Sequence, residues 1–504
     1  MVHFGSELPE RTAPPLHGCP VDLTTAQPNS ASSRKDLLRD HANRSAPSRM
    51  RWREKAAFFH HEDECYLRFL IPPGSRVLDI GCGIGDTLAA LAPSYGVGID
   101  FSSAQIDIAR RRHPNLAFVE GDAEDPATFS AIEGPFDFIL VLDTIGSLDD
   151  CQSFIERLHP LCTRETRVVF GYFSHLWYPV LKLAEALGMR MPHPDQNVLS
   201  PADLRNLVSL ADFDPVKSEQ RVLLPASLFG IGRFVNRFIS VLPGIRALSL
   251  RHYLVARSMR SAHDDISSVT VVIPARNERG NIEPAVRRIA GFCPDIEIIF
   301  IEGHSKDGTF EEMQRVQQAF SGQDIKTMKQ PGKGKADAVF TAFDAARGDV
   351  LMILDADLTM PPEQLGKFYD ALRSGKGEFI NGSRLVYPMD EGAMRFLNLV
   401  ANKIFSYLFS WLLNQRYTDT LCGTKVLRRS DYQRLKAGKA YFGDFDPFGD
   451  FDLIFGASKL NLKSIDLPIR YAARSYGETQ ISRFSHGWML LKMVVFAFFK
   501  IKAV

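Results

Sequence analysis

The chain has 504 residues, which at roughly 150 residues per domain corresponds to about two to four domains. Apolar residues make up 45% and charged residues 24%, the balance of a globular protein that buries substantial cores. The 60 Lys and Arg residues nearly balance the 59 Asp and Glu residues. The resulting net charge of +1 argues against a dedicated nucleic-acid-binding protein.

The cysteines indicate a reducing compartment. No Cys-x-x-Cys pair exists, so neither a disulfide framework nor a structural zinc site is expected. The seven cysteines are Cys19, Cys65, Cys82, Cys151, Cys162, Cys293 and Cys422. The N-terminal residues contain no apolar segment typical of a secretory signal, and a cytoplasmic location is therefore expected.

Residues 1–48 are rich in Pro, Ser, Ala, Arg and Asp and are expected to form a disordered tail, because they hold few large apolar groups. No stretch reaches the roughly 20 apolar residues of a membrane-spanning helix, so no transmembrane helix is expected. The apolar stretches 404–413 and 493–499 adjoin lysines, and both can lie along a membrane surface. Residues 491–504 form an apolar and basic C-terminal tail.

Residues 49–257 alternate strand-like apolar runs with helical stretches, which predicts a doubly wound, mostly parallel α/β sheet. A helix is expected from Arg51 to Phe69. The predicted strands are 77–80, 96–99, 117–120, 138–142 and 168–173, with further candidates at 220–224 and 253–256.

A polar linker is predicted at residues 258–268, and a second α/β domain over residues 269–490. Its predicted strands are 269–273, 297–301, 350–354 and 378–381. The expected fold class is therefore α/β with two doubly wound domains.

The first domain contains a glycine loop after its first strand. Gly81, Gly83 and Gly85 follow Asp79, and glycines there let the backbone turn tightly around a ligand. A carboxylate, Asp100, ends the next strand, and Gly121-Asp122-Ala123 follows the third. A dinucleotide site fits less well, because Asp86 occupies the position of the last glycine in the usual G-x-G-x-x-G spacing.

This constellation resembles the class I S-adenosylmethionine-dependent methyltransferases, which have a Rossmann-like fold, over roughly residues 50–255. The resemblance implies that Asp79 and the three glycines hold the methionine part of the cofactor. It implies that Asp100 holds the ribose, and Asp122 with Ala123 the adenine.

Residues on the methyl-acceptor side are harder to identify, because methyl transfer needs mainly alignment and exclusion of water. His60, His61 and His175 are candidate bases, although lone histidines are more often structural. The apolar stretch 229–242, with Arg233 and Arg237, either covers the acceptor pocket or contacts lipid; a buried amphipathic helix is the favoured interpretation.

The second domain contains an apolar strand that ends in Asp355-Ala-Asp357. Adjacent like charges repel, and a divalent cation such as Mg²⁺ or Mn²⁺ would relieve that repulsion while also binding a diphosphate. The alternative is a pair of solvated aspartates at a strand end. Two other strand ends carry polar motifs, and a basic glycine loop precedes Asp355. All of these motifs are expected in one cleft.

This constellation resembles the family 2 glycosyltransferases, of GT-A fold, over residues 268 to about 490. The nearest pattern is the dolichyl-phosphate mannosyltransferase-like, polyprenyl-phosphate branch, which shares Asp-Ala-Asp-Leu at 355–358 and Pro-Pro-Glu at 361–363. The resemblance implies the following site residues. Binding of the nucleotide-sugar donor is implied for Pro274, Arg276, Glu278, Glu302, Lys333, Lys335, Asp355, Ser383 and Arg384, metal binding for Asp355 and Asp357, and acceptor binding for Arg474, Tyr476 and Thr479. Asp419, Thr420 and Gly423 match a later segment of that branch.

Two motifs depart from the family pattern. The usual PTYNE reads PARNE here, and Glu302-Gly303 stands where two aspartates are usual, which leaves the nucleotide preference open. A hydroxyl acceptor needs a general base, for which Asp450 and Asp452 are candidates, with Asp450 favoured. A phosphate acceptor is already ionised and needs none.

The sequence therefore predicts a bifunctional, membrane-associated enzyme that moves a sugar from a nucleotide-sugar donor to a lipid-phosphate or glycan acceptor and also transfers a methyl group. The last 40 residues, 465–504, hold six basic and two acidic residues, which suits an anionic lipid, although a packed C-terminal helix explains them equally well. Two alternatives remain open. The first domain can be a non-catalytic module that senses the cofactor or docks partners, or the second a nucleotidyltransferase, although the glycine-rich activating loop of that class is missing.

Overall fold

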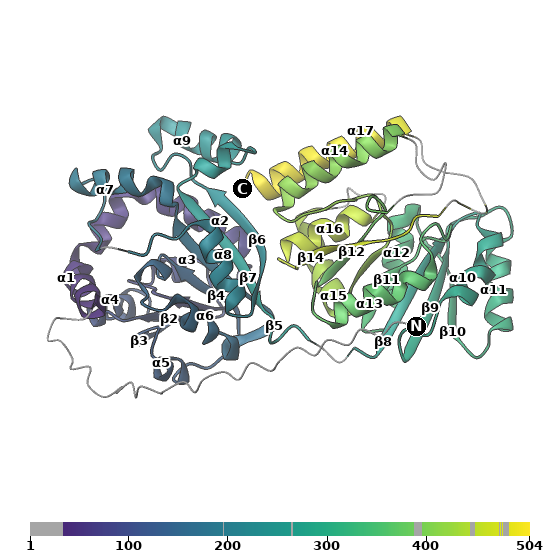
Figure 1. Ribbon diagram of the computed structural model, residues 1–504, viewed down its shortest axis with the longest axis horizontal. Coiled ribbons are helices and arrows are strands. Elements are labelled where there is room, and N and C mark those ends of the chain that lie inside the picture. Colours follow the sequence, from purple (N-terminus) through teal and green to yellow (C-terminus); the bar gives the residue numbers. More distant parts are fainter. Residues whose placement is uncertain are drawn as a thin grey trace, which may run out of the picture.

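The computed structural model describes residues 34–504 apart from 195, 264–265, 388–395, 444–448, 473, 475 and 477–482. Two α/β domains lie side by side (Figure 1). Each is built around a seven-stranded mixed sheet, so the predicted fold class is confirmed. The predicted linker lies between the last strand of the first domain, which ends at Ser258, and the first strand of the second, which begins at Ser268.

The first sheet has the strand order β3-β2-β1-β4-β5-β7-β6. Strands β1 to β5 are parallel, and β7 runs antiparallel to both β5 and β6. Its strands are β1 (Arg76–Ile80), β2 (Tyr95–Asp100), β3 (Ala117–Glu120), β4 (Phe136–Leu142), β5 (Cys162–Phe173), β6 (Phe213–Arg221) and β7 (Arg251–Ser258). The carboxyl ends of β1, β2 and β4 therefore meet at one edge.

Nine α-helices of the described residues accompany this sheet. They are α1 (Arg34–Lys55), α2 (Ala57–Leu70), α3 (Asp86–Ala90), α4 (Ser103–Arg112), α5 (Pro126–Ser130), α6 (Cys151–Glu156), α7 (Tyr178–Ala186), α8 (Pro201–Leu210) and α9 (Ile231–Phe234). Apolar side chains from both faces of the sheet form two core clusters, which accounts for the near-continuous burial of β1 and β4.

Helix α1 corrects the expected disorder for residues 34–48. Its buried stripe consists of Leu38, Ala42 and Ala46, spaced four residues apart on one helix face. Only one of the three is large, so composition alone suggests disorder. Asn43 fixes α1 to the main body by accepting a hydrogen bond from Ser102 Oγ at 2.7 Å.

The second sheet has the order β10-β9-β8-β11-β13-β12-β14, with β13 antiparallel to β11 and β12. Its strands are β8 (Ser268–Ala275), β9 (Asp295–Glu302), β10 (Asp324–Lys329), β11 (Val350–Ile353), β12 (Phe379–Ser383), β13 (Lys425–Arg428) and β14 (Ser464–Pro468). Its α-helices in the described residues are α10 (Ile282–Arg288), α11 (Thr309–Ala319), α12 (Gly334–Ala345), α13 (Leu365–Arg373), α14 (Phe396–Leu413), α15 (Arg429–Ala437), α16 (Asp450–Lys459) and α17 (Arg483–Ala497).

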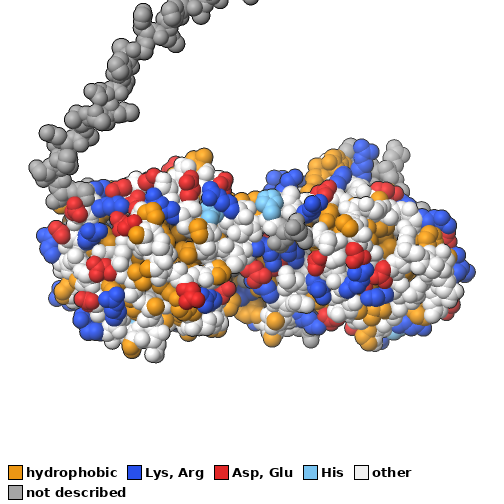
Figure 2. Space-filling model, turned by 90° about the horizontal axis from the view of Figure 1, so that it is seen from below, with side chains coloured by type: hydrophobic (Ala, Val, Ile, Leu, Met, Phe, Trp, Pro, Cys, Tyr) orange, Lys and Arg blue, Asp and Glu red, His pale blue; other side chains and the backbone are white. Residues whose placement is uncertain are grey.

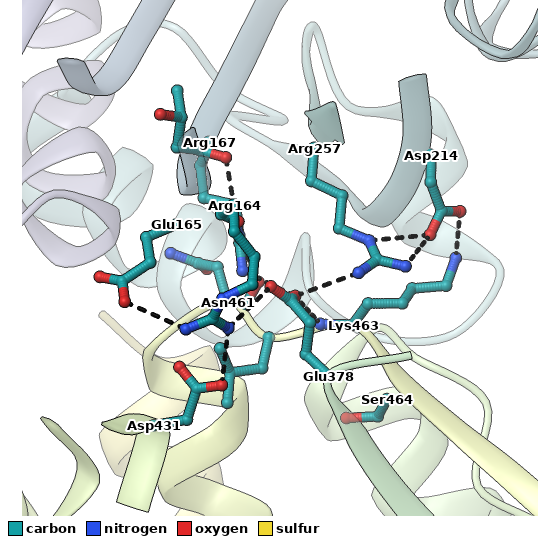
Figure 3. A network of polar contacts seen from close by, with 12 residues as sticks. Arg164, Glu165, Arg167, Asp214, Arg257, Glu378, Asp431, Asn461, Lys463 and Ser464 are labelled. Atoms are coloured by element: carbon teal, nitrogen blue, oxygen red, sulfur yellow. Dashed lines mark hydrogen bonds and ion pairs between the residues drawn. The ribbon is translucent and has the colours of Figure 1, made fainter. Parts of the chain in front are cut away.

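The two domains share an interface of buried charges (Figure 3). Glu378, just before β12, is inaccessible to solvent and accepts a hydrogen bond from Arg167 of β5 at 2.7 Å. Arg257 of β7 and Arg164 of β5 lie 3.9 Å from the same carboxylate. Burial alone would raise the pKa of Glu378, but the arginines outweigh it and hold the pKa below its usual value. The first domain thus supplies the counter-charges of a carboxylate buried in the second.

The C-terminal residues add a second group of contacts to this interface. Lys502 lies 3.1 Å from Glu219 of β6, and the Lys502 carbonyl accepts a hydrogen bond from Arg221 at 2.7 Å. Trp411 of α14 donates to the Val241 carbonyl at 2.8 Å. These contacts join α14 and the chain end to the first domain.

Four helices along the upper edge in Figure 1 carry exposed apolar side chains. These helices are α7, α9, α14 and α17. In α17 the exposed apolar residues Trp488, Leu491 and Val495 recur on one helix face. Phe229, Ile231 and Phe234 are also exposed, so the expectation of a buried helix at 229–242 is wrong for them. Within the described residues, no helix is both long and apolar enough to cross a bilayer. The opposite, lower face mixes acidic and basic side chains (Figure 2).

Candidate functional sites

The glycine loop after β1 forms the wall of a cavity of about 150 Å³ at the carboxyl edge of the first sheet. Gly81 lines it with φ of +78°, and a Cβ there would overlap the Thr144 side chain. Thr144 in turn donates a hydrogen bond to the Ile80 carbonyl at 2.7 Å. The loop is therefore shaped by close backbone packing that only glycine permits.

Asp100 ends β2 and also lines this cavity. Its carboxylate accepts hydrogen bonds from the Gly83 and Ser102 backbone nitrogens, each at 2.9 Å, which leaves further acceptor positions on both oxygens. Asp79 lies beneath on β1, and burial followed by the nearby Asp100 charge raises the pKa of Asp79 to about 7. Two carboxylates thus face the loop, one at the cavity wall and one buried behind it.

Some of the remaining predicted cofactor residues line the cavity and others do not. Asp122 and Ala123 line the cavity, whereas Gly83 and Gly85 shape the loop outside its lining. Lys35 of α1 lies 2.8 Å from Asp122 and holds the pKa of that carboxyl below its usual value, against the effect of burial. Helix α1 therefore covers the cavity, which the sequence did not predict.

A second cavity of about 70 Å³ adjoins the first. Asp143, His193, Pro194 and Gln196 line both cavities. Of the predicted candidate bases, His175 lines the second cavity, whereas His60 and His61 line neither. His193 had no recognisable sequence signal, because it lies in an irregular segment far from the motifs.

The second domain brings most of its predicted residues together at the carboxyl end of β11. Asp355 lies 2.8 Å from Lys335 of α12, and this lysine holds the pKa of Asp355 below its usual value although burial alone would raise it. A Cβ on Gly423 would overlap the Asp355 carboxylate and the Lys335 amine. A side chain at this position would therefore force Asp355 or Lys335 to move.

Asp357 is oriented by two side-chain contacts. Its carboxylate accepts a hydrogen bond from Arg474 at 2.7 Å and from the Thr359 hydroxyl at 2.8 Å. Arg474 also lies 3.2 Å from Glu278, which follows β8. Burial raises the pKa of Glu278. The first motif, the Asp-x-Asp motif and the predicted acceptor residue Arg474 thus form one cluster.

Asp450 lies at the first turn of α16, 3.7 Å from Lys335. Its Oδ1 is buried without a hydrogen-bond partner among the described residues, and burial raises its pKa. Asp452 points elsewhere, with Lys439 at 3.9 Å. Of the two predicted base candidates, only Asp450 reaches the cluster around Asp355.

Other predicted residues lie at the border of the cleft. Glu302 accepts a hydrogen bond from the Ser305 backbone nitrogen, which caps the loop after β9. Pro274 lies within β8, one residue before its end, and Arg276 and Lys333 are exposed to solvent. Their side chains are accessible to a ligand.

Arg384 has a clear structural role. It binds Asp419 at 2.7 and 2.9 Å in a two-pronged contact, and Ser383 accepts a hydrogen bond from Thr418 at 2.7 Å. The Tyr476 ring packs on Gly280 at the edge of the first motif. Thr479 lies outside the described residues.

Asp355 and Asp357 are hard oxygen ligands of the type that bind Mg²⁺ or Mn²⁺. Mg²⁺ is usually held by one or two carboxylates plus substrate phosphates, and Asp355 with Asp357 supply the carboxylates. Among the described residues, no group of three or more His, Cys, Asp or Glu side chains is arranged to hold a metal ion. The lining of the first cavity includes Asp100, Asp122 and Gly81, groups of the kind that bind the hydroxyl and amine groups of a nucleoside with an aminoacyl chain.

Comparison with known proteins identifies both domains. Residues 52–218 match the model of a methyltransferase domain, and residues 270–435 match that of glycosyl transferase family 2. Over 120 residues, the chain is 37% identical to dolichol-phosphate mannosyltransferase from Pyrococcus furiosus, covering 23% of this chain and 33% of the relative. It is 26% identical over 250 residues to the low-salt glycan biosynthesis hexosyltransferase Agl6 from Haloferax volcanii, covering 48% of this chain and 57% of the relative.

A solved structure similar to the first domain is described as an S-adenosylmethionine-dependent methyltransferase, possible histamine N-methyltransferase, from Thermotoga maritima. It has 18% identity and a TM-score of 0.35, and the match covers 44% of this chain and 99% of that one. The chain spans about a third to three-fifths of the length of the curated relatives named above. The protein joins an N-terminal methyltransferase domain to a C-terminal family 2 glycosyltransferase domain.

Proposed function

We propose that the second domain transfers a sugar from a nucleotide-sugar donor to a lipid-phosphate acceptor with the help of a divalent cation. The observation that carries this proposal is two neighbouring ion-pair groups at the carboxyl edge of the sheet. One joins Lys335 to Asp355, and the other joins Arg474 to Glu278 and Asp357. A bound Mg²⁺ or Mn²⁺ would neutralise the charge that develops on the leaving nucleoside diphosphate. Lys335 would add to that neutralisation from the protein side.

A lipid-phosphate acceptor suits the charges around Arg474. Its guanidinium lies between Glu278 and Asp357 and is partly exposed to solvent, so it offers positive charge to a phosphate. An ionised phosphate oxygen attacks the sugar without a base. Under this proposal Asp450 supports the position of Lys335, 3.7 Å away, and removes no proton.

The upper edge of the molecule supports contact with a membrane surface. The exposed apolar residues on α14 and α17 alternate with the exposed bases Lys403 and Lys492, and the Trp488 side chain is 62% exposed. Apolar side chains with interspersed lysines are typical of a helix lying on anionic lipid. Arg233 and Arg237 extend the same combination to the first domain. We infer peripheral association on the cytoplasmic side.

We further propose that the first domain uses S-adenosylmethionine to methylate the glycan product of the second. The cavity beside Asp100 and the glycine loop would hold that cofactor. Joining two transferases by a buried interface favours action on a shared product. The competing hypothesis is a first domain that binds the cofactor without using it.

The test supplies purified protein with Mn²⁺, S-adenosylmethionine, a panel of nucleotide sugars and polyprenyl phosphate in anionic vesicles. Mass spectrometry then reports sugar and methyl additions separately. Transfer of sugar to the lipid phosphate is expected, and it should stop when a chelator is added. Sugar transfer that persists with the chelator refutes the metal requirement, and sugar products that never gain a methyl group favour the non-catalytic first domain.

Asp357→Asn and Asp349→Asn form a matched pair for this assay. Asp349 lies at the opposite end of β11 and accepts a hydrogen bond from Ser268 at 2.7 Å. Loss of a charged ligand in the cleft should lower transfer by roughly a hundredfold or more. The Asp349 variant should retain activity, and equal losses in both would show that the effect is structural.

A further inference from the structure

The cavity next to the cofactor cavity carries an inference about the methyl acceptor, which rests on the proposed methyl transfer. Its shared wall includes Asp143, which follows β4 and has φ of +60°. Asp143 is held in place by Arg251, which in turn lies 3.0 Å from Asp63. A group in the second cavity therefore lies next to a molecule in the first, across a wall fixed by the ion pairs of the buried Arg251.

The charged groups that line the second cavity already have partners. Glu185 lies 2.5 Å from Arg190 and 3.3 Å from Lys182, and Asp143 is bound to Arg251. Among the described lining residues, an ammonium group would thus find both carboxylates neutralised. An incoming carboxylate or phosphate would have to displace Glu185 from its two cations. Both classes of charged acceptor are disfavoured.

The remaining polar groups suit an uncharged hydroxyl acceptor. His175 and His193 line the cavity, and Ser174 Oγ is buried there without a hydrogen-bond partner among the described residues. The rings of Phe173 and Tyr178 provide apolar walls of the kind that bind the hydrogen-bearing face of a sugar ring. Polar groups beside aromatic walls match the mixed character of a carbohydrate.

We propose that this second cavity is the methyl-acceptor site, that it takes a sugar hydroxyl, and that His193 accepts the hydroxyl proton. The acceptor oxygen forms a bond to the methyl carbon of S-adenosylmethionine. The carbon–sulfur bond breaks and its electron pair stays on sulfur. The proton of the hydroxyl passes to the imidazole of His193 and from there to water.

His193 is the lining residue best placed for this role, because it borders both cavities. Burial, then the charges of Arg190, Arg49, His41 and Lys182, lower its pKa to about 3. Its imidazole is therefore neutral at physiological pH, and the same burial and charges oppose its protonation. Proton transfer to His193 must therefore follow bond formation, when the acceptor oxygen has become more acidic than the imidazolium.

Binding is tested first, on the full-length wild-type chain with S-adenosylhomocysteine. Saturation-transfer NMR is recorded with a panel of methyl glycosides, ethanolamine and glycolate. Signals from a glycoside, and none from the two charged probes, are the expected result. Signals only from a charged probe, or from no probe, overturn the acceptor site. Failure of S-adenosylhomocysteine itself to bind overturns the proposed methyl transfer instead.

The second test addresses His193 with a matched control, His61→Gln, which alters an exposed histidine outside both cavities. His193→Gln should lower kcat for methyl transfer by about a hundredfold or more, while the Kd for S-adenosylhomocysteine changes less than about threefold. A parallel loss of cofactor binding would instead indicate a structural role and refute the assignment.

The ionisation of His193 is measured separately. The ¹³C NMR signal missing from His193→Gln identifies its ring, and in wild type this signal should not titrate between pH 5 and 8, given a pKa of about 3. Titration near the ordinary histidine value of about 6.5 would overturn the environment on which the proposal depends.

Discussion

The carboxylate of Glu378 provides a quantitative test of how the two domains are joined. Glu378→Gln preserves the shape of the side chain but leaves Arg167 and Arg257, each with a side chain 2% exposed, facing a neutral amide. Removing one partner of a buried ion pair costs about 3–5 kcal/mol. A loss of 3 kcal/mol changes the folding equilibrium by more than about a hundredfold. The variant should therefore unfold at clearly lower urea concentration.

Glu165→Gln is the matched control, because Glu165 belongs to the same network but is 40% exposed, 3.1 Å from Arg164 (Figure 3). Removing the charge of Glu165 should lower the free energy of unfolding by less than about 1 kcal/mol. The assay is urea unfolding followed by circular dichroism. Because the pKa of Glu378 is lowered in the fold, its contribution is present above the unfolded value of 4.5 and is lost as the pH falls through the folded value. Equal costs for the two variants, or an unchanged Glu378→Gln, would refute this account.

Three further predictions concern the candidate sites. Gly423→Ala should abolish sugar transfer while sparing methyl transfer in the mass-spectrometry assay, since its Cβ would overlap Asp355 and Lys335; retained transfer would contradict the geometry. Asp450→Asn should keep transfer to polyprenyl phosphate within about tenfold, and a much larger loss in kcat would assign general-base chemistry to it. Asp79 has a pKa raised to about 7, so its ionisation destabilises the fold as pH rises from 3.8 to 7. The free energy of unfolding of Asp79→Asn, relative to wild type, should therefore rise by about 2–3 kcal/mol as the pH is raised from 5 to 7.5. A difference in urea midpoints that does not depend on pH would refute the raised pKa.

The motifs were the part of the molecule that could be predicted from the sequence. Asp355, Asp357, Glu278 and Lys335 follow or adjoin strands of one sheet, and parallel strand order places their carboxyl ends together. Arg474 reaches this cluster from far along the chain, and only the family resemblance pointed to it.

Several strands could not be predicted, for identifiable reasons. Strand β10 lies at an edge and is rich in charged and polar residues, and β13 is only four residues long with a basic residue at each end. Strand β14 contains Asp466 and Pro468, which are depleted in strands. The strand predicted at 220–224 is in fact β6, Phe213–Arg221. Its start was missed because polar residues interrupt the apolar pattern along β6.

The acceptor side of the first domain shows a different limit. His193 carries no motif, and its importance arises only from where the irregular segment after α7 places it, between two cavities. The same holds for Lys35, whose ion pair with Asp122 depends on a helix with too few apolar residues to be recognised. Chain geometry, not local composition, creates both features.

The joint at Glu378 and Lys502 also restricts how a glycan could travel between the two catalytic centres. A domain on a flexible linker can move to bring its site to an intermediate, but a domain held by an interface of buried charges cannot. Under the proposed function, a shared lipid-borne intermediate would then have to diffuse laterally in the leaflet from one site to the other. The fluidity of the bilayer, more than any hinge in the polypeptide, would govern how quickly the two modifications follow one another.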